Sequence, residues 1–157
     1  MPVSRTTFEA SVEESIIIDA PPEAVFAFAS DFNNYSQISS AFYESYQTSD
    51  GPVGVGTTAV RKAYLFVRHY IFEQTVLEYD PPRRLVLRNV SPSLETTEYM
   101  SFSPNEGGTL FTLRVCGDTR SFVAISLPLI LATVDSQMRK DLRNLKKLVE
   151  DKLRREK

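Results

Sequence analysis

The chain has 157 residues, the length of one ordinary domain, and we expect residues 1–157 to form a single domain. Its 42% hydrophobic and 24% charged residues are typical of a globular protein. The formal net charge of -2 lacks the basic excess of nucleic-acid-binding proteins, so we expect no nucleic-acid partner.

Cys116 is the single cysteine, so no disulfide can form within the chain, and we expect it to act as a small buried apolar residue. The first seven residues contain no apolar run of the kind that secretory signals require. Both features lead us to expect a cytoplasmic protein.

The N-terminal third predicts one strand and two short helices. Residues 8–19 end in a β-branched run and predict the strand. Pro21, Pro22 and Glu23 predict a helix start, because proline and an acid both suit the first turn. A second short helix is expected over residues 31–38, with Asp31 as its N-cap.

From Phe42 onward, turn signals and strand patterns replace the helical ones. Hairpin connections without alternating helices favour an antiparallel sheet. The expected strands span residues 57–66, 68–79, 85–90, 95–103 and 109–117.

The strand over residues 68–79 has two mixed faces. One face carries Tyr70, Phe72 and Gln74, and the other carries His69 and Glu73. Because neither face is purely apolar, alternation does not decide which of them points inward. A strand that half-lines a cavity and an exposed amphiphilic strand both fit this pattern.

The C-terminal segment predicts a long helix that begins at Ser126 or Pro128 and ends at Arg155. Its length of about 42 Å is enough to cross a whole sheet. Apolar residues recur every three or four positions and form one face. They are Val134, Met138, Leu142, Leu145, Leu148, Val149 and Leu153.

The apolar run from Phe122 to Val134 is too short to span a bilayer, which needs about 20 residues. One interpretation is a loop and first helical turns packed over the sheet. The alternatives are a cavity lid, a transient contact with a membrane surface, and a homodimer contact.

In element order and motifs, the chain resembles the START-like helix-grip (SRPBCC) superfamily, and within it the polyketide cyclase/dehydrase and lipid-transport group. The resemblance covers about residues 9–153. It rests on IDAPPEAVF (18–26), SDFNNY (30–35), VLEYDPPRRL (76–85), GTLFTL (108–113) and DLRNLK (141–146). The family often has an aromatic residue, Pro and Trp where this chain has Tyr35, Ser36 and Gln37, which leaves the branch of the family open.

The resemblance implies an α+β fold in which a curved antiparallel sheet grips the long C-terminal helix, with two short helices after the first strand. It also implies a cavity between sheet and helix that admits an apolar ligand. Apolar sites of this kind carry a few placed polar groups. The candidate lining residues are Phe32, Tyr35, Ile38, Arg61, Tyr64, Tyr70, Phe72 and Met138.

Signals for other chemistry are missing from the sequence. It has no nucleophile motif, phosphate loop, dinucleotide fingerprint or metal-ligand spacing, and we expect no cofactor and no metal. His69, the single histidine, is expected to face solvent or to be structurally satisfied. Any enzyme here would orient its ligand and move protons with groups such as Arg61, Arg114 or Tyr64, although Arg114 is expected to point outward.

Three functions remain open at this stage. The preferred hypothesis is binding or transport of a hydrophobic small molecule such as a lipid, quinone or polyketide. The second is a cofactor-independent polyketide aromatase/cyclase or dehydratase. The third is a protein-interaction module like the co-chaperones of the superfamily.

Overall fold

The computed structural model describes residues 9–65, 67–92, 94–118 and 127–157. Within these residues the chain forms seven strands, two α-helices of at least eight residues, and two shorter helical segments. In chain order they are β1 (Glu9–Ile18), α1 (Pro22–Ala29), the 3-10 helix η1 (Phe32–Asn34), α2 (Tyr35–Ile38), β2 (Phe42–Gln47), β3 (Thr58–Leu65), β4 (Arg68–Asp80), β5 (Arg84–Val90), β6 (Glu95–Asn105), β7 (Gly108–Asp118) and α3 (Leu127–Arg155).

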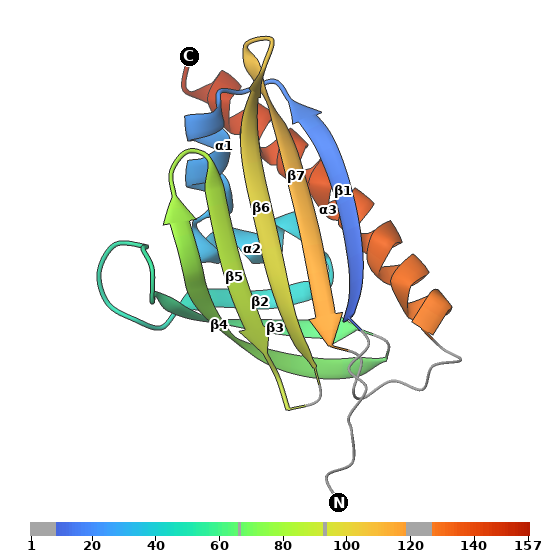
Figure 1. Ribbon diagram of the computed structural model, residues 1–157. Helices are drawn as coiled ribbons and strands as arrows, with labels where there is room; N and C mark the ends of the chain where they lie inside the picture. The colour runs from blue at the N-terminus through green and yellow to red at the C-terminus, as the bar shows by residue number, and fades with distance from the viewer. Residues whose placement is uncertain (1–8, 66, 93, 119–126) are drawn as a thin grey trace, which may run out of the picture.

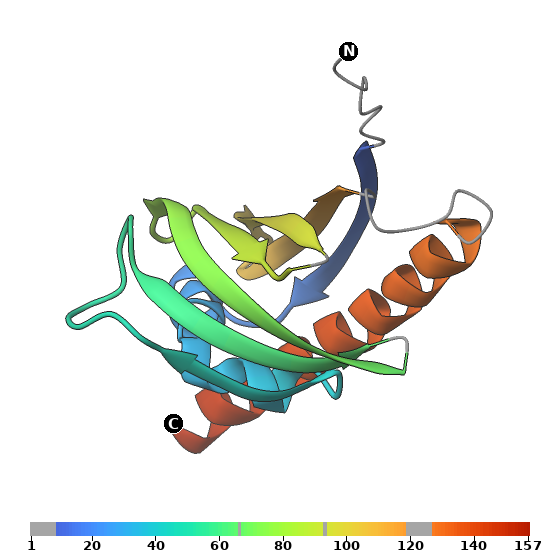
Figure 2. The same ribbon diagram turned by 90° about the horizontal axis from the view of Figure 1, so that it is seen from below.

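The strands form one antiparallel sheet in the order β1-β7-β6-β5-β4-β3-β2. Because β1 and β2 are the two edges, the helical segments α1, η1 and α2 carry the chain from one edge to the other (Figure 1). The sheet is strongly curved, and α3 lies across its concave side (Figure 2). The expected helix-grip architecture is confirmed.

Local chemistry explains the element boundaries. Pro22 occupies the first position of α1, with Glu23 in its first turn. The Asp31 side chain accepts from the backbone N–H of Asn33 and caps η1, as expected. In the β6–β7 hairpin, Glu106 (φ 46°) and Gly107 (φ 86°) both adopt the left-handed conformation that a two-residue turn of this twist requires.

The main hydrophobic core fills one end of the concave side. Phe26 of α1 makes edge-to-face contact with Phe102 of β6, at a centroid distance of 5.0 Å, and Phe102 lies 5.1 Å from Phe111 of β7. The C-terminal half of α3 covers this core on the concave side of the sheet. Its buried residues are Leu142, Leu145 and Val149, as the apolar face of the sequence predicts.

The structure decides which face of β4 points inward. Tyr70, Phe72, Gln74 and Val76 are buried, whereas Ile71 is exposed. The inward face is therefore apolar except for Gln74, which hydrogen-bonds to other buried polar groups.

Observed boundaries differ from the expected ones mostly by one or two residues, as ends of regular elements commonly do. β2 is a strand that the sequence pattern did not delimit. Of the apolar run 122–134, residues 122–126 lie outside the described residues, and Leu127 begins α3. Among the described helices, none combines the length and the apolar character needed to cross a bilayer.

Candidate functional site

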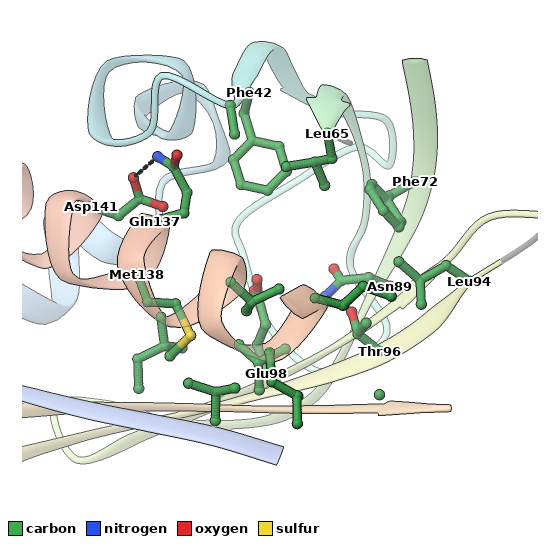
Figure 3. A pocket seen from close by; sticks show the side chains of 18 of the residues that line it. Phe42, Leu65, Phe72, Asn89, Leu94, Thr96, Glu98, Gln137, Met138 and Asp141 are labelled. Carbon is green, nitrogen blue, oxygen red and sulfur yellow. Dashed lines mark hydrogen bonds between the residues drawn. The ribbon is translucent and has the colours of Figure 1, made fainter. Parts of the chain in front are cut away.

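A cavity of about 180 Å³ lies between the sheet and the N-terminal half of α3 (Figure 3). Phe42, Leu65 and Phe72 line one side, and Met138 of α3 lines another. The remaining apolar lining comes from β1, from β7, from the connections before β2 and β6, and from α3. These residues are Ala10, Val12, Ala41, Leu94, Leu113, Val115, Gly117, Ile130, Leu131 and Val134.

The cavity exists because side chains become smaller along the strands. At the core end, the register places Ile16, Phe111 and Phe102 side by side on β1, β7 and β6. At the other end the corresponding row is Ala10, Gly117 and Thr96. The smaller residues leave unfilled space between the sheet and α3, because α3 is a straight helix and does not bend toward the sheet at this end.

The first turns of α3 cover this gap. Ile130, Leu131 and Val134 line the cavity, whereas the Leu129 side chain is 72% exposed. The helix therefore points one apolar face at the cavity.

Arg61 of β3 is the largest buried polar side chain of the site, with only 2% of its surface exposed. Its Nη1 lies 2.9 Å from Oε1 of Glu98 on β6. Its guanidinium also lies 3.8 Å from the ring centroid of Tyr35 and 4.6 Å from that of Phe42. Two aromatic faces and one carboxylate together compensate the buried positive charge.

A chain of buried amides extends this ion pair along the sheet. With its amide oxygen turned toward Arg61, Gln74 accepts from Nε at 3.2 Å and from Nη2 at 2.9 Å. The side-chain amides of Gln74 and Asn89 lie 2.7 Å apart, and Asn89 bonds to the Thr96 hydroxyl at 3.1 Å. Residues of β3, β4, β5 and β6 thus form one polar wall, and the inward positions of the strands place them there.

One acceptor of this wall has no partner. Oε2 of Glu98 is buried and makes no hydrogen bond within the described residues. The Glu98 side chain is only 12% exposed and lines the cavity. An unpaired buried acceptor is unfavourable, so this oxygen marks where the polar wall is incomplete.

Asp141 of α3 brings a second carboxyl group to the cavity. Its Oδ1 accepts from Nε2 of Gln137 at 2.8 Å, one turn earlier on the helix (Figure 3). Burial raises the pKa of Asp141 to about 6, and hydrogen bonds from Gln137 and Ser39 lower it only in part. A carboxyl group that titrates near neutrality is suited to exchanging protons with a ligand.

Three of the eight residues predicted to line a cavity do so. They are Arg61, Phe72 and Met138. Tyr70 is buried beside them, with its ring stacked on that of Phe72 at 5.7 Å.

The other four lie elsewhere. Phe32 of η1 and Ile38 of α2 are buried in the main hydrophobic core. Tyr35 packs between that core and Arg61, and burial raises the pKa of its phenol well above the ordinary value, so it stays protonated. Tyr64 is 50% exposed, because it lies on the outward face of β3.

The remaining singled-out residues lie outside the cavity. His69 is exposed and packs between the rings of Tyr43 and Tyr64. Arg114 is also exposed, with its guanidinium 5.6 Å from the Tyr99 ring. Cys116 is buried, as expected. Within the described ranges, no three His, Cys, Asp or Glu side chains form a group that could hold a metal ion.

Comparison of the sequence with known protein families identifies one match. A sequence model of the family described as "Polyketide cyclase / dehydrase and lipid transport" matches residues 9–150. The chain belongs to this family. No curated protein matches the sequence. The family description names polyketide and lipid ligands, and a largely apolar cavity agrees with ligands of these classes.

Solved structures share the fold of this family member at low sequence identity. The Zhui aromatase/cyclase from Streptomyces sp. R1128 superposes with a TM-score of 0.76, at 14% identity over 93% of this chain and 96% of that chain. A START superfamily protein from Mycobacterium smegmatis gives 0.76, at 13% identity over 90% and 97%. The protein TTHA0849 from Thermus thermophilus gives 0.75, at 18% identity over 90% and 98%.

Sequence reasoning missed Gln74, Asn89, Glu98 and Asp141 as site residues. A signal existed for two of them. Glu98 lies two positions before the apolar Met100 and therefore on the same face of β6. Asp141 lies three residues after Met138 on the apolar face of α3. A charged residue at such an apolar position is informative, because burying a charge without a purpose is costly.

Proposed function

We propose that this member of the family binds a small, mainly apolar molecule in the cavity between the sheet and the N-terminal half of α3. The observation that carries this proposal is the apolar enclosure around one polar wall. A combination of apolar lining and few polar groups is the usual form of a small-molecule site.

The volume of the cavity indicates the size of the ligand. Engineered apolar cavities of about 150 Å³ bind benzene, and sites for drug-sized ligands span roughly 300–1,000 Å³. A cavity of about 180 Å³ therefore suits a one- or two-ring molecule, or one end of a longer ligand that extends out of the cavity.

Polyketide cyclisation or dehydration is a second candidate, and Asp141 is the observation that favours it. Ring closure requires a proton to leave carbon and another to reach a carbonyl oxygen, and a carboxyl group with a pKa of about 6 can exchange protons at neutral pH. A ligand-free interaction module has less support, because the cavity is not collapsed.

Native mass spectrometry of the purified protein, followed by organic extraction of any bound compound, tests the binding proposal. We expect a bound apolar species or saturable uptake of an apolar fluorescent probe. A protein that carries no compound and takes up no probe would contradict the proposal.

Two substitutions on α3 locate the binding site. Val134→Trp fills the cavity and should lower probe affinity at least about tenfold, because the indole occupies the ligand volume. Leu129→Trp is the matched control, since Leu129 faces solvent on the same helix. Equal loss of affinity in both variants would place the probe outside the cavity.

The enzyme candidate has a separate test. A linear poly-β-ketone mimic is incubated with the protein, and ring formation is followed by absorbance and mass spectrometry. If Asp141 moves the proton, Asp141→Asn retains mimic binding and loses product formation. A wild-type protein that binds the mimic without converting it would favour a carrier.

A further inference from the structure

The guanidinium of Arg61 in the polar wall is bonded within the protein. Arg61 directs Nη1 to Glu98, and Nε and Nη2 to Gln74, while the rings of Tyr35 and Phe42 cover its guanidinium. A guanidinium holds its N–H groups in a rigid fork, so these partners fix its orientation. These contacts use three of the five N–H groups of Arg61, and Glu98 already supplies its counter-charge.

The neighbouring amides are also engaged. Asn89 bonds to Gln74 and to Thr96, and Gln137 donates to Asp141. These contacts hold the amides of Asn89 and Gln137 against other groups of the protein.

An acceptor, in contrast, remains. Oε2 of Glu98 is buried without a partner among the described residues, and an ionised carboxylate only accepts hydrogen bonds. Asp141 adds a second carboxyl group to the same cavity. Arg61 with Glu98 and Asp141 carries one more negative than positive charge when both acids are ionised.

We propose that the cavity selects ligands that present a hydrogen-bond donor, such as a phenolic hydroxyl or a ring N–H, to Oε2 of Glu98, and rejects ligands whose only polar group is a carboxylate. This inference rests on the binding function proposed above and deepens it. A donor completes the partners of Oε2, whereas a carboxylate would face two like charges beside a guanidinium that Glu98 already neutralises.

A matched series of two-ring ligands tests the preference on the unmodified protein. Isothermal titration at pH 7.5 compares 2-naphthol, 2-methoxynaphthalene, naphthalene and 2-naphthoate. We expect 2-naphthol to bind about ten- to hundredfold more tightly than 2-methoxynaphthalene, the range for a hydrogen bond to a charged acceptor. Naphthoate should bind more weakly than naphthalene.

Glu98→Gln tests the residue itself. A glutamine of nearly equal volume still offers one oxygen to Arg61 but presents an amide N–H where Oε2 was. The advantage of 2-naphthol should fall to within about threefold, and 2-methoxynaphthalene should gain affinity. Glu95→Gln is the matched control, because Glu95 pairs with Arg88 rather than lining the cavity.

The outcomes separate this inference from the function on which it rests. If no member of the series binds the wild-type protein, the binding function fails. If naphthalene, 2-naphthol and 2-methoxynaphthalene bind equally well, the binding function stands and the donor preference is overturned. If circular dichroism shows that Glu98→Gln does not fold, the wild-type series alone decides.

Discussion

The guanidinium of Arg61 on β3 pairs with the carboxylate of Glu98 on β6, with Nη1 and Oε1 2.9 Å apart. Strands β4 and β5 lie between these two strands in the sheet. Three strand spacings amount to about 14 Å in a flat sheet, so the inward curl helps two long side chains to meet. The ion pair therefore joins two parts of the sheet across the concave side and forms the centre of the polar wall.

Replacing Arg61 with methionine should lower the free energy of unfolding by about 3–5 kcal/mol, because it leaves the Glu98 carboxylate buried without its counter-charge. Urea denaturation measures the change. Arg61→Met combined with Glu98→Gln should recover much of the loss, since the carboxylate that lost its counter-charge is then also removed.

The matched control for this prediction is Arg84→Met. It removes an ion pair with Glu78 in which each side chain is about half exposed. It should cost less than about 1 kcal/mol. Similar losses at Arg61 and Arg84 would show that the buried pair contributes no more than a surface pair.

Asp141→Asn should stabilise the protein at neutral pH. The folded-state pKa of about 6 lies above the ordinary value of 3.8, so folding favours the protonated acid. The wild-type contribution is therefore fully favourable below about pH 4, and it is lost as the pH rises toward 6. One pKa unit corresponds to about 1.4 kcal/mol, and partial exposure places the expected gain at pH 7.5 at about 1–2 kcal/mol.

Unfolding measured from pH 4 to pH 7.5 checks this prediction. The slope between pH 4 and pH 6 should be smaller in Asp141→Asn than in the wild type. A carboxyl ¹³C titration of Asp141 with its midpoint near pH 4 would contradict the assigned environment.

Val67→Gly should raise the free energy of unfolding by about 1 kcal/mol. Val67, in the connection between β3 and β4, has φ 58°, a conformation that strains a β-branched residue, and its side chain is 85% exposed. Glycine removes the strain without loss of buried surface.

Val55→Gly is the matched control, because Val55 is 71% exposed and is not among the residues with positive φ. Thermal denaturation should show a lower melting temperature for this variant, since glycine mainly adds disorder to the unfolded chain. Stabilisation by both substitutions, or by neither, would argue against strain at Val67.

Gly108→Ala should destabilise the fold by about 1–3 kcal/mol. A Cβ at this position would lie 2.5 Å from the backbone oxygen of Ile18, so β7 or the end of β1 would have to move. Gly54→Ala provides the comparison, because a Cβ there meets nothing within 4 Å. Chemical denaturation of both variants measures the difference, and equal stabilities would refute the predicted close approach.

The sequence by itself determined the order and type of most elements. Pro22 and Glu23 begin α1, Asp31 caps η1, and apolar residues at helical spacing predict α3. These features act over a few residues, because capping, turn chemistry and periodicity are local. The family resemblance in the same stretches predicted the curved sheet and its long helix, which the structure confirms.

Only the tertiary structure decided which residues surround the cavity. The mixed pattern of β4 left Gln74 unassigned until its neighbours Arg61 and Asn89 were in place. Likewise, the pairing of Arg61 with Glu98 depends on sheet order and curvature, which bring together residues 37 positions apart. A local pattern predicts the buried face of an element only where one face is clearly apolar, as in α3 but not in β4, whereas the partner of a side chain depends on long-range packing.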